Sequence, residues 1–374
     1  MKIKNLIIFY PSFERGGVEM IIKNLINYIS KKNIKIYLIT LNSMNTNIIK
    51  KSKNFKIIHP KNKIFKFLPN RFSTAISSIR TLIQISKKLN SSNTVIHSMQ
   101  SNFIPIIIAK FLRFKIVIRN SEDPIESIKY SEDKFSSYLI FILRFIFYNL
   151  VDKIITNSKG SSNSLKFFLF GKNKDKVKYI YNPYIEKIRK INLKKKENII
   201  LAVGRLCKQK NFKDLILSFN DFQKKFKNYK LNIIGDGYEK EMLKKLIISL
   251  NLKKKIFLKG YVKNLTKEYK KAKLFVLPSI YEGLGNVLLD ALNHSVPCIS
   301  TKCKSGPSEI LCNGKGGILV PIKNTKLLTN ALIDSIDNYK LSINKMMFAK
   351  KKIYRFYLIS QSEKYINELN NVLK

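Results

Sequence analysis

Residues 274–321 contain two consecutive strand–loop–helix units, and this stretch constrains the fold more than any other part of the chain. The first unit has a predicted strand at 274–277, a loop with one acid among small residues at 281–285, and a short apolar helix at about 286–293. A second unit follows at 297–309. Because ligands in parallel α/β sheets bind beyond the carboxyl ends of the strands, we expect both loops at one ligand-binding edge.

The same alternation of short apolar strands and amphipathic helices runs through the rest of the chain. Apolar residues recur at helical spacing over 18–30, for example. Strands are predicted at residues 6–10, 34–41, 56–59, 94–97, 115–119, 154–157, 178–181, 199–203, 230–234, 256–259, 274–277 and 297–301. This repeated β-α-β order predicts an α/β protein with right-handed parallel sheets.

The length of 374 residues exceeds one ordinary domain and predicts two. We expect a Rossmann-like domain over 1–185 and another over 186–351, with the charged segment 186–198 as a linker. A C-terminal helix at about 352–374 is expected to pack back on the first domain. Two α/β halves that face each other imply a deep cleft between them.

The formal net charge of +47 bears on the kind of partner. A charge of this size is typical of proteins that bind nucleic acid or anionic membranes. Lys, Asn and Ile are abundant from end to end, however, as in chains encoded by A/T-rich genomes, and the positive charge is not gathered into one arm. Part of the charge can serve anionic lipid or an anionic substrate, whereas nucleic acid is the less favoured partner.

Residues 137–151 form the most hydrophobic segment. The segment is shorter than the roughly 20 residues that span a bilayer, and Arg144 interrupts it. We therefore expect a buried core helix. The alternative is a helix that lies at a membrane surface, with Lys153 and its neighbours facing lipid head groups.

The cysteines and the N-terminus favour a cytoplasmic location. Cys207, Cys298, Cys303 and Cys312 include no CxxC pair, so neither a zinc site nor a disulfide framework is predicted. The apolar run at 6–10 is short, has Pro after it, and reads as a first strand instead of a signal peptide.

Two strand-to-helix loops have residues that suit phosphate. Gly16 and Gly17 lie between a predicted strand and a helix, where close-approaching backbone N–H groups bind anions. Gly204 and Arg205 follow the strand at 199–203, and Lys210 comes just before the next helix. A guanidinium and an ammonium group together match the charge of a diphosphate.

Four motifs carry a resemblance to a known family: Gly16–Met20, Val203-Gly204-Arg205 with Gln209-Lys210, Ile234–Gly237 and Tyr281–Gly283. In these motifs the chain resembles glycosyltransferase family 4, whose members are retaining sugar transferases with a GT-B fold and nucleotide-sugar donors. Residues 282–291 and 305–311 are most similar to the branch that builds lipid-linked oligosaccharides and surface polysaccharides. The resemblance covers nearly the whole chain and is looser before Leu150.

The resemblance implies a set of site residues. It implies catalytic roles for Glu282, Arg205, Lys210 and His97, and donor-binding roles for Gly16, Gly17, Gly204, Gly235, Tyr261, Val262, Gly283, Leu284, Gly285, Asn286 and Asp290. In the family, the first acid of an E-x7-E pair holds the donor sugar and the second holds the ribose. Glu282 matches the first acid. The second position is Asp290, whose side chain is one methylene shorter than that of Glu. The Asp290 carboxylate is therefore expected to contact the ribose either directly, after a small shift in position, or through a bridging water molecule.

The acceptor side is implied by the loops after the strands at 94–97 and 115–119. The resemblance places His97, Arg119, Ser121 and Glu122 there, although a plain strand-end histidine is the competing interpretation of His97. Glu309 either caps the helix that it begins or lines the cleft. Since no DxD pair follows a strand, no metal site is expected. A cofactor is not expected either, because the nucleotide sugar that the resemblance implies is a substrate.

These observations predict a retaining glycosyltransferase. It is expected to move a sugar from a UDP- or GDP-sugar to a lipid-linked or growing glycan in cell-envelope polysaccharide synthesis, such as that of lipopolysaccharide O-antigen. We expect it to work at the anionic inner face of the membrane, without nucleic acid. The alternatives are a GT-B-fold sugar-nucleotide epimerase or phosphorylase, and a basic nucleic-acid-binding protein.

Overall fold

The computed structural model of the protein describes residues 2–10, 17–40, 49, 52–60, 70–99, 102–193 and 196–374, with backbone only for 70–76. It divides into two compact units. Unit 1 consists of Met1–Glu186 together with Phe356–Lys374, and unit 2 consists of Lys187–Arg355. Unit 2 is therefore one continuous segment inserted into unit 1.

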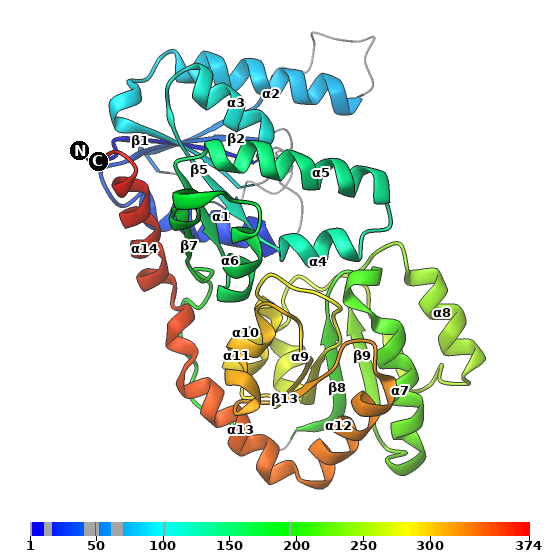
Figure 1. Ribbon diagram of the computed structural model, residues 1–374. Helices are drawn as coiled ribbons and strands as arrows, with labels where there is room; N and C mark the ends of the chain where they lie inside the picture. Colours follow the sequence, from blue (N-terminus) through cyan, green and yellow to red (C-terminus); the bar gives the residue numbers. More distant parts are fainter. Residues whose placement is uncertain are drawn as a thin grey trace. The chain divides into compact units, whose positions relative to one another are not determined.

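The sheet of unit 1 is parallel throughout and has the order β3-β2-β1-β4-β5-β6-β7 (Figure 1). Its strands are β1 (Asn5–Phe9), β2 (Lys35–Ile39), β3 (Phe55–Ile58), β4 (Thr94–Ser98), β5 (Lys115–Asn120), β6 (Lys153–Thr156) and β7 (Val177–Tyr179). Strands that are apolar on both faces need cover on both faces. In β1, Leu6 and Ile8 belong to one hydrophobic cluster, whereas Ile7 and Phe9 belong to another.

Helices cover both faces of this sheet. They are α1 (Gly17–Ile29), α2 (Asn70–Ser86), α3 (Phe103–Phe111), α4 (Pro124–Lys129), α5 (Lys134–Phe147), α6 (Lys159–Lys166) and α14 (Leu358–Asn371), with 3₁₀ turns η2 (Ser91–Asn93), η3 (Tyr148–Leu150) and η4 (Gly171–Lys176). The helices α1 and α14 pack together, and Tyr365 and Leu369 of α14 are buried in the same cluster as Leu6 and Ile8. The C-terminal helix is thus part of the core of unit 1.

The prediction of a buried core helix at 137–151 is wrong for one face of that helix. Of the residues in α5, only Ser137 is buried. Among the described residues, its Phe141 and Phe145 pack against Phe168, whereas Phe135 and Tyr138 are exposed. Lys153 does not face outward either, because its Nζ lies 3.1 Å from Oε2 of Glu368 in α14.

Unit 2 has a second parallel sheet with the order β10-β9-β8-β11-β12-β13. Its elements are β8 (Glu197–Val203), η5 (Lys208–Lys210), α7 (Phe212–Lys225), β9 (Lys230–Ile234), α8 (Lys240–Ser249), β10 (Ile256–Leu258), α9 (Thr266–Lys271), β11 (Ala272–Leu277), α10 (Asn286–Asn293), β12 (Cys298–Thr301), α11 (Pro307–Ile310), η6 (Cys312–Gly314), β13 (Ile318–Val320), α12 (Thr325–Asp337) and α13 (Tyr339–Lys351), and η7 (Ile353–Phe356) leads back to unit 1. The predicted α/β architecture with two parallel sheets is confirmed. Since all strands of this sheet point the same way, the loops after β8, β9, β11 and β12 lie along one edge.

Among the helices of the described ranges, none is both long enough and apolar enough to cross a membrane.

Candidate active site

The loops after β8 and β9 touch through their backbones. Gly204 N–H donates to the carbonyl of Ile234 at 2.9 Å, and Leu206 N–H donates to the carbonyl of Asp236 at 2.9 Å. A Cβ atom on Gly235, whose φ is +143°, would lie 1.8 Å from the Gly204 carbonyl oxygen. Only glycine permits this approach, and the approach fixes the loop that carries Arg205.

Lys210 and Glu282 form a close ion pair at this edge. The Lys210 Nζ lies 2.5 Å from Oε1 of Glu282, and Ser279 Oγ donates to the same oxygen at 2.7 Å. Glu282 is only 6% exposed, so its carboxylate depends on these partners. The stem of Lys210 passes over Gly204, where a Cβ would lie 3.3 Å from the Lys210 Cδ. The pair therefore links the loop after β8 to the loop after β11.

Ser279 has a role that the sequence did not single out. Its carbonyl accepts hydrogen bonds from Thr301 Oγ1 at 2.5 Å and from Cys303 Sγ at 3.2 Å, while its hydroxyl holds Glu282. Burial raises the pKa of the Cys303 thiol to about 12, so this thiol stays protonated and able to donate. The available signal was its position three residues before Glu282, directly after Pro278 at the end of β11.

A second contact ties the same two loops together. Gln209 Nε2 donates to the carbonyl of Tyr281 at 3.0 Å, and Ile280 N–H donates to the carbonyl of Gln209 at 2.8 Å. Glu282 is thereby held from both sides by backbone and side-chain bonds. A carboxylate fixed in this way has little rotamer entropy left to lose when it binds a ligand.

The N-terminus of α10 begins at the predicted donor loop. Its N-cap is Gly285, with φ of +88° and no side-chain cap, so no cap side chain occupies the first N–H groups of the helix. Gly283, Leu284 and Gly285 are buried. A Cβ on Gly306 would lie 2.5 Å from the Leu284 backbone, which brings the loop after β12 against this loop.

The other donor-side candidates lie in α10 and in the loops after β8, β9 and β10. Asn286 and Asp290 are half-buried in α10. Arg205 is exposed, with Nη2 3.4 Å from Oε1 of Gln209. Tyr261 is exposed after β10, next to the half-buried Val262, and Gly260 connects that loop to β9 because its carbonyl accepts from Gly235 N–H at 2.9 Å.

Glu309 lies in the first turn of α11 and is half-buried. The residue before that helix is Gly306, which has no side chain that could form a capping box. The backbone carbonyl of Glu309 accepts from Nη2 of Arg355 at 3.1 Å.

The acceptor-side candidates all belong to unit 1, where two of them are deeply buried. His97 in β4 is 1% exposed, and its Nδ1 lies 3.0 Å from the Val117 carbonyl. Its Nε2 has no hydrogen-bond partner among the residues that the structure describes.

Gly17, a donor-side candidate of unit 1, is the exposed first residue of α1, and Gly16 lies outside the described residues.

Arg119 links three parts of unit 1. It is 2% exposed, and its guanidinium donates to Tyr365 Oη at 2.9 Å, to Ser121 Oγ at 2.5 Å and to Asn182 Oδ1 at 2.5 Å. These bonds hold α14 and the segment after β7 to β5. Glu122 is exposed, and its carbonyl accepts from Asn120 Nδ2.

Burial lowers the pKa of His97 to about 4, so its imidazole is neutral in the folded protein at neutral pH. In the unfolded chain the same group titrates near its ordinary value of about 6.5. Between these two values only the unfolded chain takes up the proton, so stability falls as the pH falls. We expect the wild type to lose about 2 kcal/mol more unfolding free energy than His97→Asn when urea titrations at about pH 7.5 and about pH 4.5 are compared. Equal losses in both proteins would contradict this burial.

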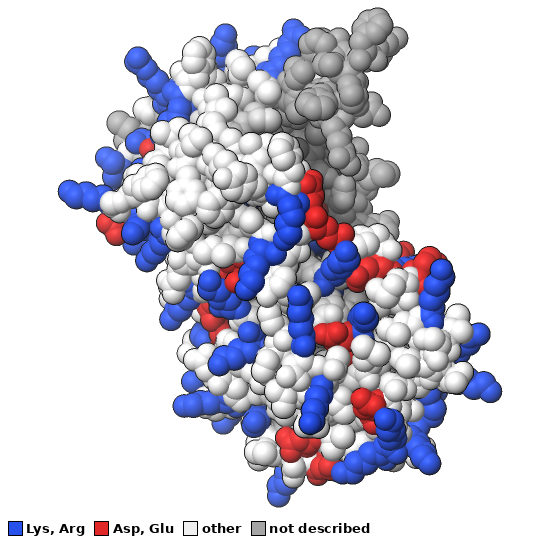
Figure 2. All heavy atoms as spheres, turned by 45° about the vertical axis from the view of Figure 1, so that its right-hand side comes forward, with Lys and Arg blue, Asp and Glu red and all other residues white. Residues whose placement is uncertain are grey.

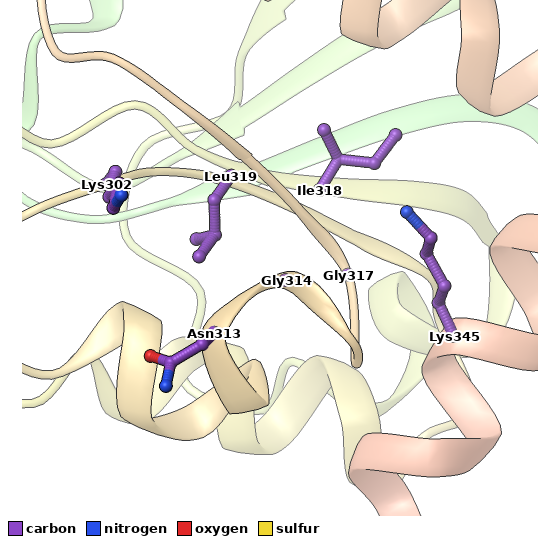
Figure 3. A pocket seen from close by; sticks show the side chains of 7 residues that line it. All are labelled: Lys302, Asn313, Gly314, Gly317, Ile318, Leu319 and Lys345. Atoms are coloured by element: carbon purple, nitrogen blue, oxygen red, sulfur yellow. The ribbon is translucent and has the colours of Figure 1, made fainter.

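A separate cavity of about 420 Å³ lies between η6, β13 and α13 (Figure 3). Lys302 and Lys345 line it, together with Asn313, Gly314, Gly317, Ile318 and Leu319. None of the predicted site residues lines this cavity. The buried Glu282 carboxylate and the Lys210 ammonium meet instead at the loops after β8 and β11, where the donor site is predicted. Within the described ranges, no group of three or more His, Cys, Asp or Glu side chains is arranged to hold a metal ion.

Two protein-family models match the chain. The model described as Glycosyltransferase Family 4 matches residues 15–185, and the model described as Glycosyl transferases group 1 matches residues 184–352. Together they include every candidate residue named above.

Individual relatives agree with these models. An uncharacterized glycosyltransferase of Methanocaldococcus jannaschii is 34% identical over 251 residues, which are 62% of this chain and 60% of that relative. The match thus spans less than two thirds of that protein. N-acetylgalactosamine-N,N'-diacetylbacillosaminyl-diphospho-undecaprenol 4-alpha-N-acetylgalactosaminyltransferase of Campylobacter jejuni is 28% identical over 347 residues, 91% of this chain and 92% of that relative.

A solved structure shows the same fold. HepE of Anabaena, crystallised in complex with UDP and glucose, superposes with a TM-score of 0.79 at 16% identity, covering 98% of this chain and 100% of that chain. The two parallel α/β units thus have the GT-B fold, and the two family models identify the chain as a glycosyltransferase. The chain belongs to glycosyltransferase family 4.

Proposed function

We propose that the protein is a retaining glycosyltransferase that moves a sugar from a UDP- or GDP-sugar to a hydroxyl of a lipid-linked or growing glycan. The acceptor class is supported by the C. jejuni relative, whose name specifies a diphospho-undecaprenol acceptor. The donor class is supported by HepE, which was crystallised with UDP and glucose. The product enters cell-envelope polysaccharide, including lipopolysaccharide O-antigen, and the reaction takes place on the cytoplasmic face of the membrane.

The observation that carries this proposal is the Lys210–Glu282 pair beside the uncapped N-terminus of α10. A nucleoside diphosphate leaving group develops negative charge as the bond to the sugar breaks. Lys210, Arg205 and the α10 N–H groups supply positive charge for it, and preorganised charge of this kind is commonly the largest contribution to catalysis. Glu282 is left to accept hydrogen bonds from the hydroxyl groups of the donor sugar.

The proposed reaction needs no resident metal or cofactor, since the cations of unit 2 take the place that a metal ion has in other sugar transferases. This part of the proposal has its own check. Transfer rates should be unchanged after dialysis against EDTA, and the addition of Mg²⁺ or Mn²⁺ should not raise them.

Thermal stabilisation across a set of nucleotides tests the donor class. UDP or GDP at about 100 times its Kd should stabilise the protein by about 2.7 kcal/mol, which raises Tm by several degrees. Transfer of radiolabelled sugar to a lipid diphosphate acceptor, with inversion or retention read from the anomeric configuration of the product, tests the reaction. Stabilisation by no nucleoside diphosphate would overturn the proposal.

The transfer assay and the thermal-stability measurement also separate the rival functions. A sugar-nucleotide epimerase converts its substrate when no acceptor is present, and a phosphorylase needs free phosphate. A nucleic-acid-binding protein would gain stability with random duplex DNA, and this gain would fall steeply with salt. We expect none of these three results.

A further inference from the structure

Helix α5 carries a continuous apolar stripe on its solvent side. Phe135, Tyr138, Leu139, Ile142 and Ile146 are all exposed, from 39% for Ile142 to 81% for Phe135. Their spacing places them along one side of the helix. We call these five side chains the α5 face.

The opposite side of α5 is already packed against protein. Phe141 and Phe145 have ring centroids 5.2 Å and 5.0 Å from that of Phe168, a buried core residue. Arg144, the cation in the middle of the helix, turns inward and donates from Nη1 to the carbonyl of Pro124 at 2.7 Å. A helix that is apolar on all sides normally has a partner on all sides, and the α5 face has none in this chain among the described residues.

Neighbouring elements carry further exposed apolar side chains beside α5. Phe167 and Phe170, which follow α6, are exposed and have ring centroids 5.6 Å and 6.0 Å from that of Phe145. Phe111 of α3, a helix that also contacts α5, is 83% exposed. Single exposed apolar side chains are ordinary, but a contiguous set of aromatic and branched residues marks an interaction surface.

The charges of these elements are strongly biased. Because Arg144 turns inward, Lys134 is the one cation of α5 outside its packed side. There is one Lys in α3, which pairs with Asp152, and there are two Lys in α6 and three in η4, whereas the single acid within these four elements is Asp175. Figure 2 shows a wide area of unit 1 without charged side chains, with mostly Lys and Arg and a few Asp or Glu around its edge. The acids closest in sequence to α5 are Glu132 and Asp133, of which Asp133 caps the helix through Ser136 N–H.

We propose that the α5 face docks on an anionic lipid bilayer, with α5 lying along the bilayer surface. An apolar stripe rimmed by cations is the pattern of a helix that rests in the head-group region. A second copy of this chain would bring a like-charged rim against the first, which disfavours self-association through the same face. This inference rests on the proposed function, in which the acceptor is itself held in a membrane, and it names the surface that reaches it.

Vesicle binding by the full-length protein tests the proposal without any substrate. The protein is sedimented with vesicles of phosphatidylcholine containing phosphatidylglycerol. Wild type should bind, and the double variant Ile142→Asp with Ile146→Asp should bind about tenfold or more weakly, because two charges then face the acyl region. Binding should also weaken on vesicles of phosphatidylcholine alone and at high salt.

A matched control is available in unit 2. Ile248 of α8 is 49% exposed, close to the 54% of Ile146, so Ile248→Asp is the matched control for the single variant Ile146→Asp. Ile248→Asp should leave vesicle binding unchanged. Equal loss in both variants would show a general charge effect and overturn the proposal.

A fluorescence measurement keeps the test valid if the double variant folds poorly. The chain has no Trp, so Ile146→Trp and Ile248→Trp each introduce one reporter. Only Trp at 146 should shift its emission to the blue on vesicle addition and be quenched by brominated lipid acyl chains. Vesicle binding without that shift, or light scattering that shows the Asp variants breaking up a dimer, would assign the face to another role.

The outcome is separable from that of the proposed function. Stabilisation by UDP or GDP reports on unit 2 and should be the same in the Asp variants and the wild type. If the protein binds nucleotide but not vesicles, the membrane-docking inference is wrong and the proposed function is unaffected.

Discussion

Glu282→Gln is expected to lower kcat by about 10²- to 10³-fold, the range found when a preorganised polar group of an active site is removed. Glutamine keeps the shape of the side chain and can still accept from Lys210 and Ser279, but it lacks the negative charge that balances the Lys210 ammonium. Initial rates of sugar transfer at saturating donor measure the effect. A variant within threefold of the wild type would contradict the assignment of Glu282.

Ser279 offers a graded control for this prediction. Ser279→Ala removes one of the two bonds to Glu282 Oε1. The loss of one hydrogen bond that positions the carboxylate should raise the activation free energy by about 1.4 kcal/mol and so lower kcat by about tenfold. Ser279→Thr, which keeps a hydroxyl, should recover part of the rate. Thermal denaturation of each variant shows whether the fold is retained.

Among glycine-to-alanine substitutions in unit 2, Gly235→Ala is expected to lower the free energy of unfolding the most. Its Cβ would lie 1.8 Å from the Gly204 carbonyl oxygen, and the residue has a φ of +143°, which side-chain-bearing residues rarely adopt. The two loops have to separate, so we expect a loss of about 4 kcal/mol or more of unfolding free energy. Urea denaturation measures the loss, and thermal shift with UDP or GDP should show weakened nucleotide binding.

Gly314→Ala is the matched control. Gly314 also has a positive φ, +90°, but nothing lies within 4 Å of its added Cβ. The substitution should therefore cost only the backbone strain, about 1–2 kcal/mol. If both variants lost the same stability, the close approach of Gly235 to Gly204 would not be the cause.

The positions of the strands could be predicted because they depend on the local sequence. Each strand at 6–10, 94–97 or 199–203 is an apolar run between breakers, and the β-α-β order then restricts the sheets to parallel ones. The three-residue strand β13 was not predicted, although β7 and β10, which are equally short, were. For 137–151 a buried helix was preferred to the alternative of a surface helix because apolar composition indicates burial, and composition cannot show that one side of a helix lacks a partner.

The candidate site was only partly accessible from the sequence. The loops with Glu282 and Lys210 could be identified as strand-end loops, but these two residues are 72 positions apart, and their pairing is a tertiary contact. The deep burial of His97 and Arg119 was equally hidden, because their partners lie on other strands or on α14. The roles assigned to these residues in donor and acceptor binding stay predictions.

The return of the chain to unit 1 has a consequence for the order of synthesis. Unit 2 is a continuous segment, so it can fold as soon as Arg355 has left the ribosome. Unit 1 cannot complete its fold at that point, because Tyr365 of α14 is part of its core and accepts a hydrogen bond from Arg119. Tyr365 is synthesised 246 residues after Arg119. The half of the protein that is translated first is therefore the half that matures last, with an open core that α14 closes.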